Sequence, residues 1–357
     1  MSKHTLKINS ILDSINNSNV KLGDEFSISQ GIVTGIDRVS PKHGRKFNAF
    51  KNRIGEGVFI IDQEFKDSLP VRELEIIKPW FKNSDIQKFS TREVTDKYLI
   101  HINAETDLSN YPVIEKHLLE YQELIKSRNF ESGELSKAKR MGSWWALSSS
   151  RRDFDFSKPK IISPQRSYEN NFGFTDKLWC ASADVYFITA KTENCSIYSL
   201  LVLLNSNLYY HWLYHRGKRK GDMLELYLTP LANIPLPNLT NNQQHLFDLL
   251  SQLQIFYTKK KKSNNQFVTT ISDGIVYEIF FPDHMKERKI DILQFVEKDK
   301  EAIMQNREFD QLTDDEKEKV INQLYARWTD PESEIVKRMN SFAEKSPDIL
   351  KPILEIR

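Results

Sequence analysis

Basic side chains are concentrated in one stretch of this 357-residue sequence, between Lys137 and Arg166. About eight cations there stand against about two acids, Asp153 and Asp155. The cations are Lys137, Lys139, Arg140, Arg151, Arg152, Lys158, Lys160 and Arg166. Clustered guanidinium and ammonium groups favour a polyanion such as nucleic acid, and the alternative is a solvated face of an ordinary globular protein.

The side-chain types separate two kinds of contact. Guanidinium and amide groups can form paired hydrogen bonds with base edges, and Arg151, Arg152, Gln165 and Arg166 are the candidates for this readout. Flexible ammonium groups and exposed arginines suit phosphates. The phosphate candidates are Arg45, Lys46, Lys137, Lys139, Arg140, Lys218, Arg219 and Lys220.

Two neighbouring tryptophans, Trp144 and Trp145, lie within the basic stretch. They could stack at an interface, and the alternative is that they anchor the surrounding segment to the apolar core. Residues 129–158 lack periodicity, so we expect a long surface excursion there.

A second basic segment, residues 216–221, follows an apolar stripe formed by Leu200, Leu203, Leu204 and Leu208. The spacing predicts one helix over residues 199–212. Gly217 and Gly221 should let the backbone turn sharply while the cations between and beside them face outward.

Short β-branched or aromatic runs predict strands at residues 58–61, 98–102, 160–162 and 185–188. Pro112 suits a helix start, and Ile114, Leu118, Tyr121 and Ile125 form its apolar stripe. Beyond residue 240 the pattern becomes mostly helical. The fold class is therefore α+β, with a lead-in segment at 1–21, a mixed α/β domain at 22–240 and a helical domain at 241–357.

Within the last domain, residues 243–257 are periodic, residues 259–265 interrupt the pattern, and Ile271, Ile275 and Ile279 restart it. Thr313 and Glu316 resemble a capping box ahead of Val320, Leu324 and Trp328. Composition favours a folded cytoplasmic protein, because no apolar run approaches the length of a membrane span and no secretory segment begins the chain. Cys180 and Cys195 are expected to be buried free thiols.

Several of these segments occur in an order that resembles a known family. They are residues 28–35 (ISQGIVTG), 77–80 (IKPW), Tyr111-Pro112, Trp144-Trp145, 158–162 (KPKII), 203–206 (LLNS), the basic segment 216–221 and 233–237 (NIPLP). The ordered set, over about residues 22 to 240, resembles the TaqI-like specificity domain of type IIG-like, adenine-specific restriction-modification methyltransferases.

The resemblance implies a module that binds double-stranded DNA and gives target specificity to a partner methyltransferase domain or subunit, with or without a nuclease. Such enzymes extrude the target adenine and hold it with an Asn/Asp-Pro-Pro-aromatic motif, which this sequence lacks. The chain alone is therefore not expected to be an enzyme. S-adenosylmethionine is expected in the missing catalytic domain, which would lie upstream of residue 1, or in a partner. The chain could be a natural subunit, a remnant or a fragment.

Other functions remain as alternatives. One is a protein-interaction scaffold of a defence complex with an incidental basic patch. Asp283, Glu287 and Lys289 imitate a Mg-dependent nuclease pattern, but the gap between them is short. His211 and His215 lie one helical turn apart, as zinc ligands can, without a third ligand, so no metal site is expected. Residues 148–150 offer hydroxyl groups without a nearby histidine base.

Overall fold

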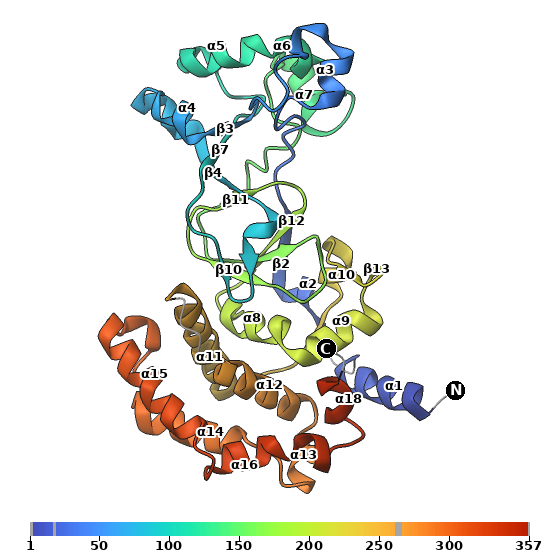
Figure 1. Cartoon of the computed structure of the whole chain (residues 1–357), viewed down its shortest axis with the longest axis vertical. Helices are drawn as coiled ribbons and strands as arrows, with labels where there is room; N and C mark the ends of the chain where they lie inside the picture. Colours follow the sequence, from blue (N-terminus) through green and yellow to red (C-terminus); the bar gives the residue numbers. More distant parts are fainter. Residues whose placement is uncertain (1–2, 17–18, 261–265, 356–357) are drawn as a thin grey trace.

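The computed structural model describes residues 3–16, 19–260 and 266–355. The strand-rich part of the chain is stacked on a curved layer of C-terminal helices, which gives an elongated α+β molecule (Figure 1). Helices α1 (Lys3–Asn16) and α18 (Leu350–Leu354) both pack on α9 (Asn207–Arg216). The expected fold class is confirmed. The first and last described helices lie near each other, because both contact α9.

An antiparallel sheet of four strands forms the middle of the molecule. Its order is β10 (Gly173–Thr175), β8 (Lys160–Pro164), β12 (Val185–Ala190) and β2 (Phe26–Gln30). Phe187 of β12 lies opposite Ile162 of β8 on one side and Ser29 of β2 on the other. The strands predicted at residues 160–162 and 185–188 are confirmed.

Both faces of this sheet are buried. The cross-strand pair Ile161 and Ile188 packs into one apolar core, and the pair Ile162 and Phe187 packs into a second core. Successive side chains of a strand point to opposite faces, so the two cores share the sheet as a common wall. Every residue of β8 is buried for this reason.

The second core is completed by another sheet of four strands, in the order β11 (Cys180–Ala181), β4 (Ile77–Phe81), β7 (Lys97–Ile100) and β3 (Ile60–Asp62). Strand β11 is parallel to β4, and the other pairs are antiparallel. The predicted strands at 58–61 and 98–102 are confirmed as β3 and β7, although β3 begins only at Ile60.

The helix predicted after Pro112 forms, but it is interrupted. Helix α5 (Pro112–Glu120) is followed by α6 (Gln122–Lys126), and Tyr121 between them has φ −107° and ψ 11°. All four residues of the predicted stripe are buried. The expectation of an irregular excursion over residues 129–158 was wrong in part, because it contains α7 (Gly133–Met141).

The smaller elements of the strand-rich part connect these layers. They are β1 (Val20–Lys21), α2 (Leu22–Glu25), α3 (Pro41–Lys46), α4 (Gln63–Asp67), β5 (Ile86–Gln87), β6 (Ser90–Thr91), β9 (Arg166–Ser167), β13 (Arg219–Lys220), β14 (Met223–Glu225), α10 (Leu228–Ala232) and β15 (Pro235–Leu236). Short 310 turns occur at Asn48–Phe50, Val71–Ile76, Asn83–Asp85, Leu108–Asn110 and Phe309–Gln311.

The single helix predicted over residues 199–212 is two helices, α8 (Ile197–Asn205) and α9. Ser206 ends α8 and caps α9, and its hydroxyl oxygen accepts from the Tyr209 N–H at 3.3 Å. The buried Asn205 amide donates to the Phe172 carbonyl at 2.8 Å and accepts from the Phe172 N–H at 3.0 Å. The Leu-Asn-Ser segment at 204–206 therefore has a structural role, because it joins α8 to α9 and bonds their junction to the segment around Phe172.

The C-terminal part is helical, as expected. Its helices are α11 (Asn241–Lys259), α12 (Gln266–Phe280), α13 (Pro282–Glu287), α14 (Leu293–Met304), α15 (Asp314–Trp328), α16 (Glu334–Asn340) and α17 (Phe342–Lys345). Thr313 and Glu316 form the predicted capping box of α15. Residues 261–265 of the predicted interruption lie outside the described residues.

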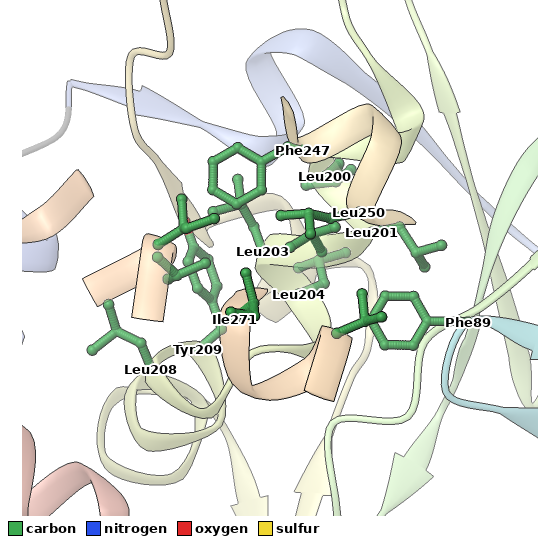
Figure 2. Packing of buried hydrophobic residues seen from close by; sticks show 14 of the residues in the cluster. Phe89, Leu200, Leu201, Leu203, Leu204, Leu208, Tyr209, Phe247, Leu250 and Ile271 are labelled. Atoms are coloured by element: carbon green, nitrogen blue, oxygen red, sulfur yellow. The ribbon is translucent and has the colours of Figure 1, made fainter. Parts of the chain in front are cut away.

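The first core continues across residue 240. Figure 2 shows Leu201 and Leu204 of α8 close to Leu250 of α11 and Ile271 of α12. The helices after residue 240 thus cover the apolar side of α8, and each part buries surface that the other would expose to water. The boundary proposed between 240 and 241 stays a prediction.

None of the described helices combines the length and the apolar character needed to cross a membrane. Both cysteines are free thiols, but only Cys180 is buried as expected, and Cys195 is half-buried. Burial raises the pKa of Cys180 to about 12.

Lys160 was counted among the surface cations of the basic stretch, and this was wrong. Its side chain is fully buried at the start of β8. The ammonium group donates to the carbonyl oxygens of Phe156, Lys158 and Lys177 at 2.7, 3.0 and 2.9 Å. Burial lowers the pKa of Lys160 to about 8, so at neutral pH the group keeps its proton and binds three carbonyls together.

We expect Lys160→Met to destabilise the fold by about 1–3 kcal/mol, because buried carbonyl groups lose their donor. Urea unfolding followed by tryptophan fluorescence measures this change. The matched control is Lys158→Met, since Lys158 is exposed two residues earlier. Equal stability of the two variants would show that the buried ammonium contributes nothing.

Candidate nucleic-acid interface

Two of the candidate base-reading residues come together at one end of the central sheet. Gln30, the last residue of β2, accepts a hydrogen bond from Arg151 Nη2 at 3.3 Å and donates to the Ala183 carbonyl at 2.8 Å. Gln165 directly follows β8, and its N–H donates to the Asp184 carbonyl at 2.8 Å. Arg151 is thus linked to Gln165 through Gln30 and residues 183–184.

Close backbone packing fixes this end of the sheet. Gly31 donates its N–H to the Val185 carbonyl at 2.9 Å. A Cβ atom at Gly31 would lie 2.1 Å from the Ser182 carbonyl oxygen, so only glycine fits there. Arg151 Nε also donates to the Gly31 carbonyl at 3.3 Å. Arg151 has φ +53°, half-buries its side chain and braces this turn, so less of its guanidinium is available to a ligand than the sequence indicated.

The basic segment at 216–221 is not a free loop. Strands β13 and β14 pair through Arg219 with Leu224 and Lys220 with Met223, and β14 pairs on its other side with β9. Gly221 turns the hairpin with φ +61°, as predicted. The three strands lie in the order β13, β14 and β9, so β14 separates Arg166 from Arg219 and Lys220, while Lys218 precedes β13. We call this small sheet with its four cations, Arg166, Lys218, Arg219 and Lys220, the basic ribbon.

The role predicted for Gly217 was wrong. Its backbone is extended, with φ −70° and ψ 174°, so it makes no left-handed turn. Glycine is needed because a Cβ atom would lie 2.4 Å from the Leu213 carbonyl oxygen. Arg216 points elsewhere, since its guanidinium lies 3.7 Å from Asp13 of α1.

A buried carboxylate organises the basic ribbon. Glu225 is 6% exposed and binds Arg166 through one oxygen and Lys218 through the other, each at 3.2 Å. Burial by itself would raise the pKa of Glu225, but the hydrogen bonds from Lys218, Arg166 and Tyr227 hold it below its usual value. Glu225 is therefore ionised at neutral pH. Arg219 lies over the Tyr214 ring at 4.0 Å, and Lys220 is exposed.

Two of the other phosphate candidates, Lys137 and Lys139, and the base-reading candidate Arg152 lie beside carboxylates on and near α7. Lys137 and Arg152 both pair with Glu105, and Lys139 pairs with Glu131 at 2.6 Å. The hydrogen bond from Lys137 and the charge of Arg152 keep the pKa of Glu105 below its usual range. These pairs are exposed, so water screens them and they are weak. Arg140 is also exposed.

A hollow of about 500 Å³ lies between this cluster and Arg151. It is lined by Ser29, Asn103, Ala104, Glu105, Glu134, Lys137, Arg151, Arg152, Asp153 and Phe154. The hydroxyl groups of Ser149 and Ser150 donate to Glu134 at 2.7 and 2.8 Å. Burial opposes ionisation of Glu134, yet the Ser150 and Ser149 hydrogen bonds hold its pKa below the usual value. These serines position an acid rather than face a base.

The remaining candidates are more distant. Trp144 and Trp145 are half-buried, stack edge to face with ring centres 5.9 Å apart, and pack against the second core. Arg45 and Lys46 are exposed on α3, at the end of the molecule farthest from the C-terminal helices (Figure 1). The described contacts do not link them to the basic ribbon.

Sequence reasoning missed several residues at this site. Gln30, Glu225 and Tyr227 hold candidate cations in place, and Arg38, Lys82 and Lys97 line a shallow groove of about 700 Å³ beside residues 182–183. Gln30 and Lys82 each come at or just after a strand end, where polar side chains often reach a ligand, and this signal could have found them.

The alternative metal sites gain no support from the described residues, among which no group of three or more His, Cys, Asp or Glu side chains could hold a metal ion. Asp283 and Glu287 lie on α13, and Lys289 follows it with φ +54°. The rings of His211 and His215 lie with their centres 4.6 Å apart and their planes tilted by 53° within the aromatic helix α9.

Comparison with known proteins identifies the region that contains most of these residues. Residues 78–236 match the family model of the TaqI-like C-terminal specificity domain. Type II methyltransferase M.BanIII from Aneurinibacillus aneurinilyticus is 29% identical over 150 residues, which are 41% of this chain and 25% of that relative. This chain thus spans about a quarter of the curated relative that it matches. The resemblance seen in the sequence is confirmed for the specificity domain.

Two solved structures align with the fold. The type IIL restriction-modification enzyme MmeI, in complex with DNA, aligns over 92% of this chain and 36% of its own, with 11% identity and a TM-score of 0.46. The type IIG restriction endonuclease BpuSI aligns over 77% of this chain and 33% of its own, with 14% identity and a TM-score of 0.41.

If the cations around Glu105 face DNA, Glu105→Gln should raise the affinity for duplex DNA of any sequence at least about twofold at low salt, because Lys137 and Arg152 lose their neutralising partner. Fluorescence anisotropy with a labelled duplex measures the change. Glu64→Gln is the control, since it alters net charge equally at an exposed position on α4. The same gain in both variants would contradict a local role for Glu105.

Proposed function

Because residues 78–236 match the TaqI-like C-terminal specificity domain, we propose that this chain is the sequence-specific duplex DNA-binding module of an adenine-specific restriction-modification methyltransferase. In this proposal the chain carries no catalysis of its own. S-adenosylmethionine and the catalytic residues belong to a methyltransferase domain or subunit, with or without a nuclease. In this proposal the protein acts in the cytoplasm, in defence against phage DNA.

One observation carries the proposal. Cations and amides of the matched region, together with Gln30 of β2, meet in one network of contacts. Arg151 binds Gln30, Gln30 binds the 183–184 turn, and this turn binds Gln165. The Gln165 carbonyl then accepts from the Leu226 N–H at 2.9 Å, which fixes the basic ribbon to the end of the sheet. A surface built in this way can present several donors in fixed relative positions.

The mechanism assigns different tasks to fixed and movable groups. Gln165 and Arg166 leave a rigid strand end, so they suit readout of base edges in the major groove. Arg219 and Lys220 on the hairpin suit phosphates, and Lys137 can exchange Glu105 for phosphate oxygens. Arg152 was a base-reading candidate in the sequence, but it shares Glu105 with Lys137, so we assign it to phosphates as well. Phosphate contacts would set the register while the partner methyltransferase extrudes one adenine.

The decisive experiment is to incubate the purified chain with a randomised duplex library at low and then near-physiological salt, and to sequence the retained DNA. Enrichment of one short motif supports the proposal and identifies the target. Salt-sensitive retention without enrichment would remove sequence specificity from this chain. No retention at any salt would favour the protein-interaction scaffold.

If about six phosphates are contacted, the logarithm of the binding constant should fall with the logarithm of salt concentration with a slope of about −5. Lys220→Ala should weaken binding to all sequences alike and reduce that slope by about one, because it removes one phosphate contact. Lys319→Ala on the exposed surface of α15 is the control and should change neither quantity. A loss at one base pair only would reassign Lys220 to base readout.

A further inference from the structure

Glu225 occupies an unusual place for an acid in a region proposed to bind DNA. It lies in β14, directly opposite Arg166 of β9, and its N–H donates to the Lys218 carbonyl at 2.8 Å. Its side chain is only 7% exposed, whereas those of Arg166 and Lys218 are 41% and 60% exposed. The carboxylate thus sits beneath two cations that come from segments about fifty residues apart in the sequence.

Tyr227 completes the arrangement. Its hydroxyl accepts from Arg166 Nη2 at 2.6 Å and donates to the Glu225 carboxylate at 3.2 Å. The centre of its ring lies 4.9 Å from the Lys218 ammonium group and 5.7 Å from the Arg166 guanidinium. A cation beside an aromatic face and a carboxylate is restricted in direction as well as in position.

These contacts use one edge of the Arg166 guanidinium. Nε and Nη2 both lie 3.2 Å from the same Glu225 oxygen, and Nη2 also donates to Tyr227. Nη1 has no partner among the described residues, and the side chain is partly exposed. A guanidinium is planar and rigid, so fixing one edge also fixes the direction of its remaining donors.

We propose that Glu225 is a positioning residue for DNA readout, which aims Arg166 Nη1 at an acceptor on a base edge and holds Lys218 at a fixed distance for a neighbouring phosphate. The inference rests on the proposed function and adds a specificity-determining residue to it. Glu225 touches no DNA in this arrangement, because it lies beneath the cations that it orients.

The proposal opposes the simplest electrostatic expectation. Removing a negative charge near DNA should strengthen binding to every sequence, since less phosphate repulsion remains. Glutamine has the size of Glu225 but only one acceptor oxygen, and it turns an NH₂ group toward one of the two cations. Arg166 or Lys218 is then released. Glu225→Gln should therefore lower discrimination at one base pair about tenfold, while affinity for unrelated duplexes stays equal or rises.

Discrimination is measured as the ratio of dissociation constants for the duplex that the full-length chain selects and for single-base-pair variants of it. The matched control is Asp222→Asn, which removes an exposed carboxylate from the turn of the same hairpin. It should raise affinity for all duplexes and leave the ratio unchanged. If Glu225→Gln changes affinity by the same factor for every duplex, as Asp222→Asn does, the positioning role is refuted.

Arg166→Ala tests whether Glu225 acts through the guanidinium. Arg166→Ala should lower discrimination at the same base pair. The double variant with Glu225→Gln should lose no further discrimination there, because the effects of two residues that act as a unit do not add. Independent, additive losses would overturn the proposal. Thermal unfolding checks that each variant is folded.

If Glu225→Gln does not fold, Tyr227→Phe keeps the ring and removes only the hydroxyl. It should lower discrimination at the same base pair by a smaller factor, and unchanged discrimination would overturn the proposal. If the proposed function itself is wrong, the wild-type chain enriches no motif from the randomised library, and this result is distinct from a failure of the positioning role. If the wild-type chain selects a motif and the Glu225→Gln variant selects it equally well, only the positioning role of Glu225 is refuted.

Discussion

The burial of the central sheet on both faces is the constraint on which the rest of the structure depends. Ile161 and Ile188 belong to one core, and Ile162 and Phe187 belong to the other. A shift of β8 by one residue would exchange these sets between the cores, so its register is strongly fixed. Gln165 and Arg166 follow β8 without an intervening loop, and their backbone positions are therefore fixed by the packing of both cores.

The same pairing of acid and base has different consequences on this surface, and exposure decides between them. Glu105 is about half exposed, so its bonds to Lys137 and Arg152 compete with water and can be replaced by another anion. Glu225 is nearly buried and is also held by Tyr227, so it would leave its place only if the ribbon came apart. One carboxylate screens cations, and the other orients them.

Some strands and helices could be predicted from local periodicity, as in β8, β12, α11 and α15, but β2 and β10 of the same central sheet were not predicted. Charge alone could not separate buried from exposed cations, so Lys160 was misassigned, since its three carbonyl partners come from chain reversals that periodicity does not reveal. The pairing of β9 with β14 joins residues about sixty apart. The sequence around Arg166 and around Glu225 contains no local pattern that predicts this contact.

The net charge of +2 gives this chain little long-range attraction for a polyanion. On the proposed function, affinity must then come from a few cations in fixed places rather than from a generally positive surface. The hairpin could not place Lys218, Arg219 and Lys220 reliably if it were free. Its hydrogen bond from Leu226 to Gln165 and its pairing with β9 connect it to the buried sheet. The apolar cores therefore determine where the charges of the ribbon lie. A core mutation that shifts β8 should also shift the cations of the ribbon.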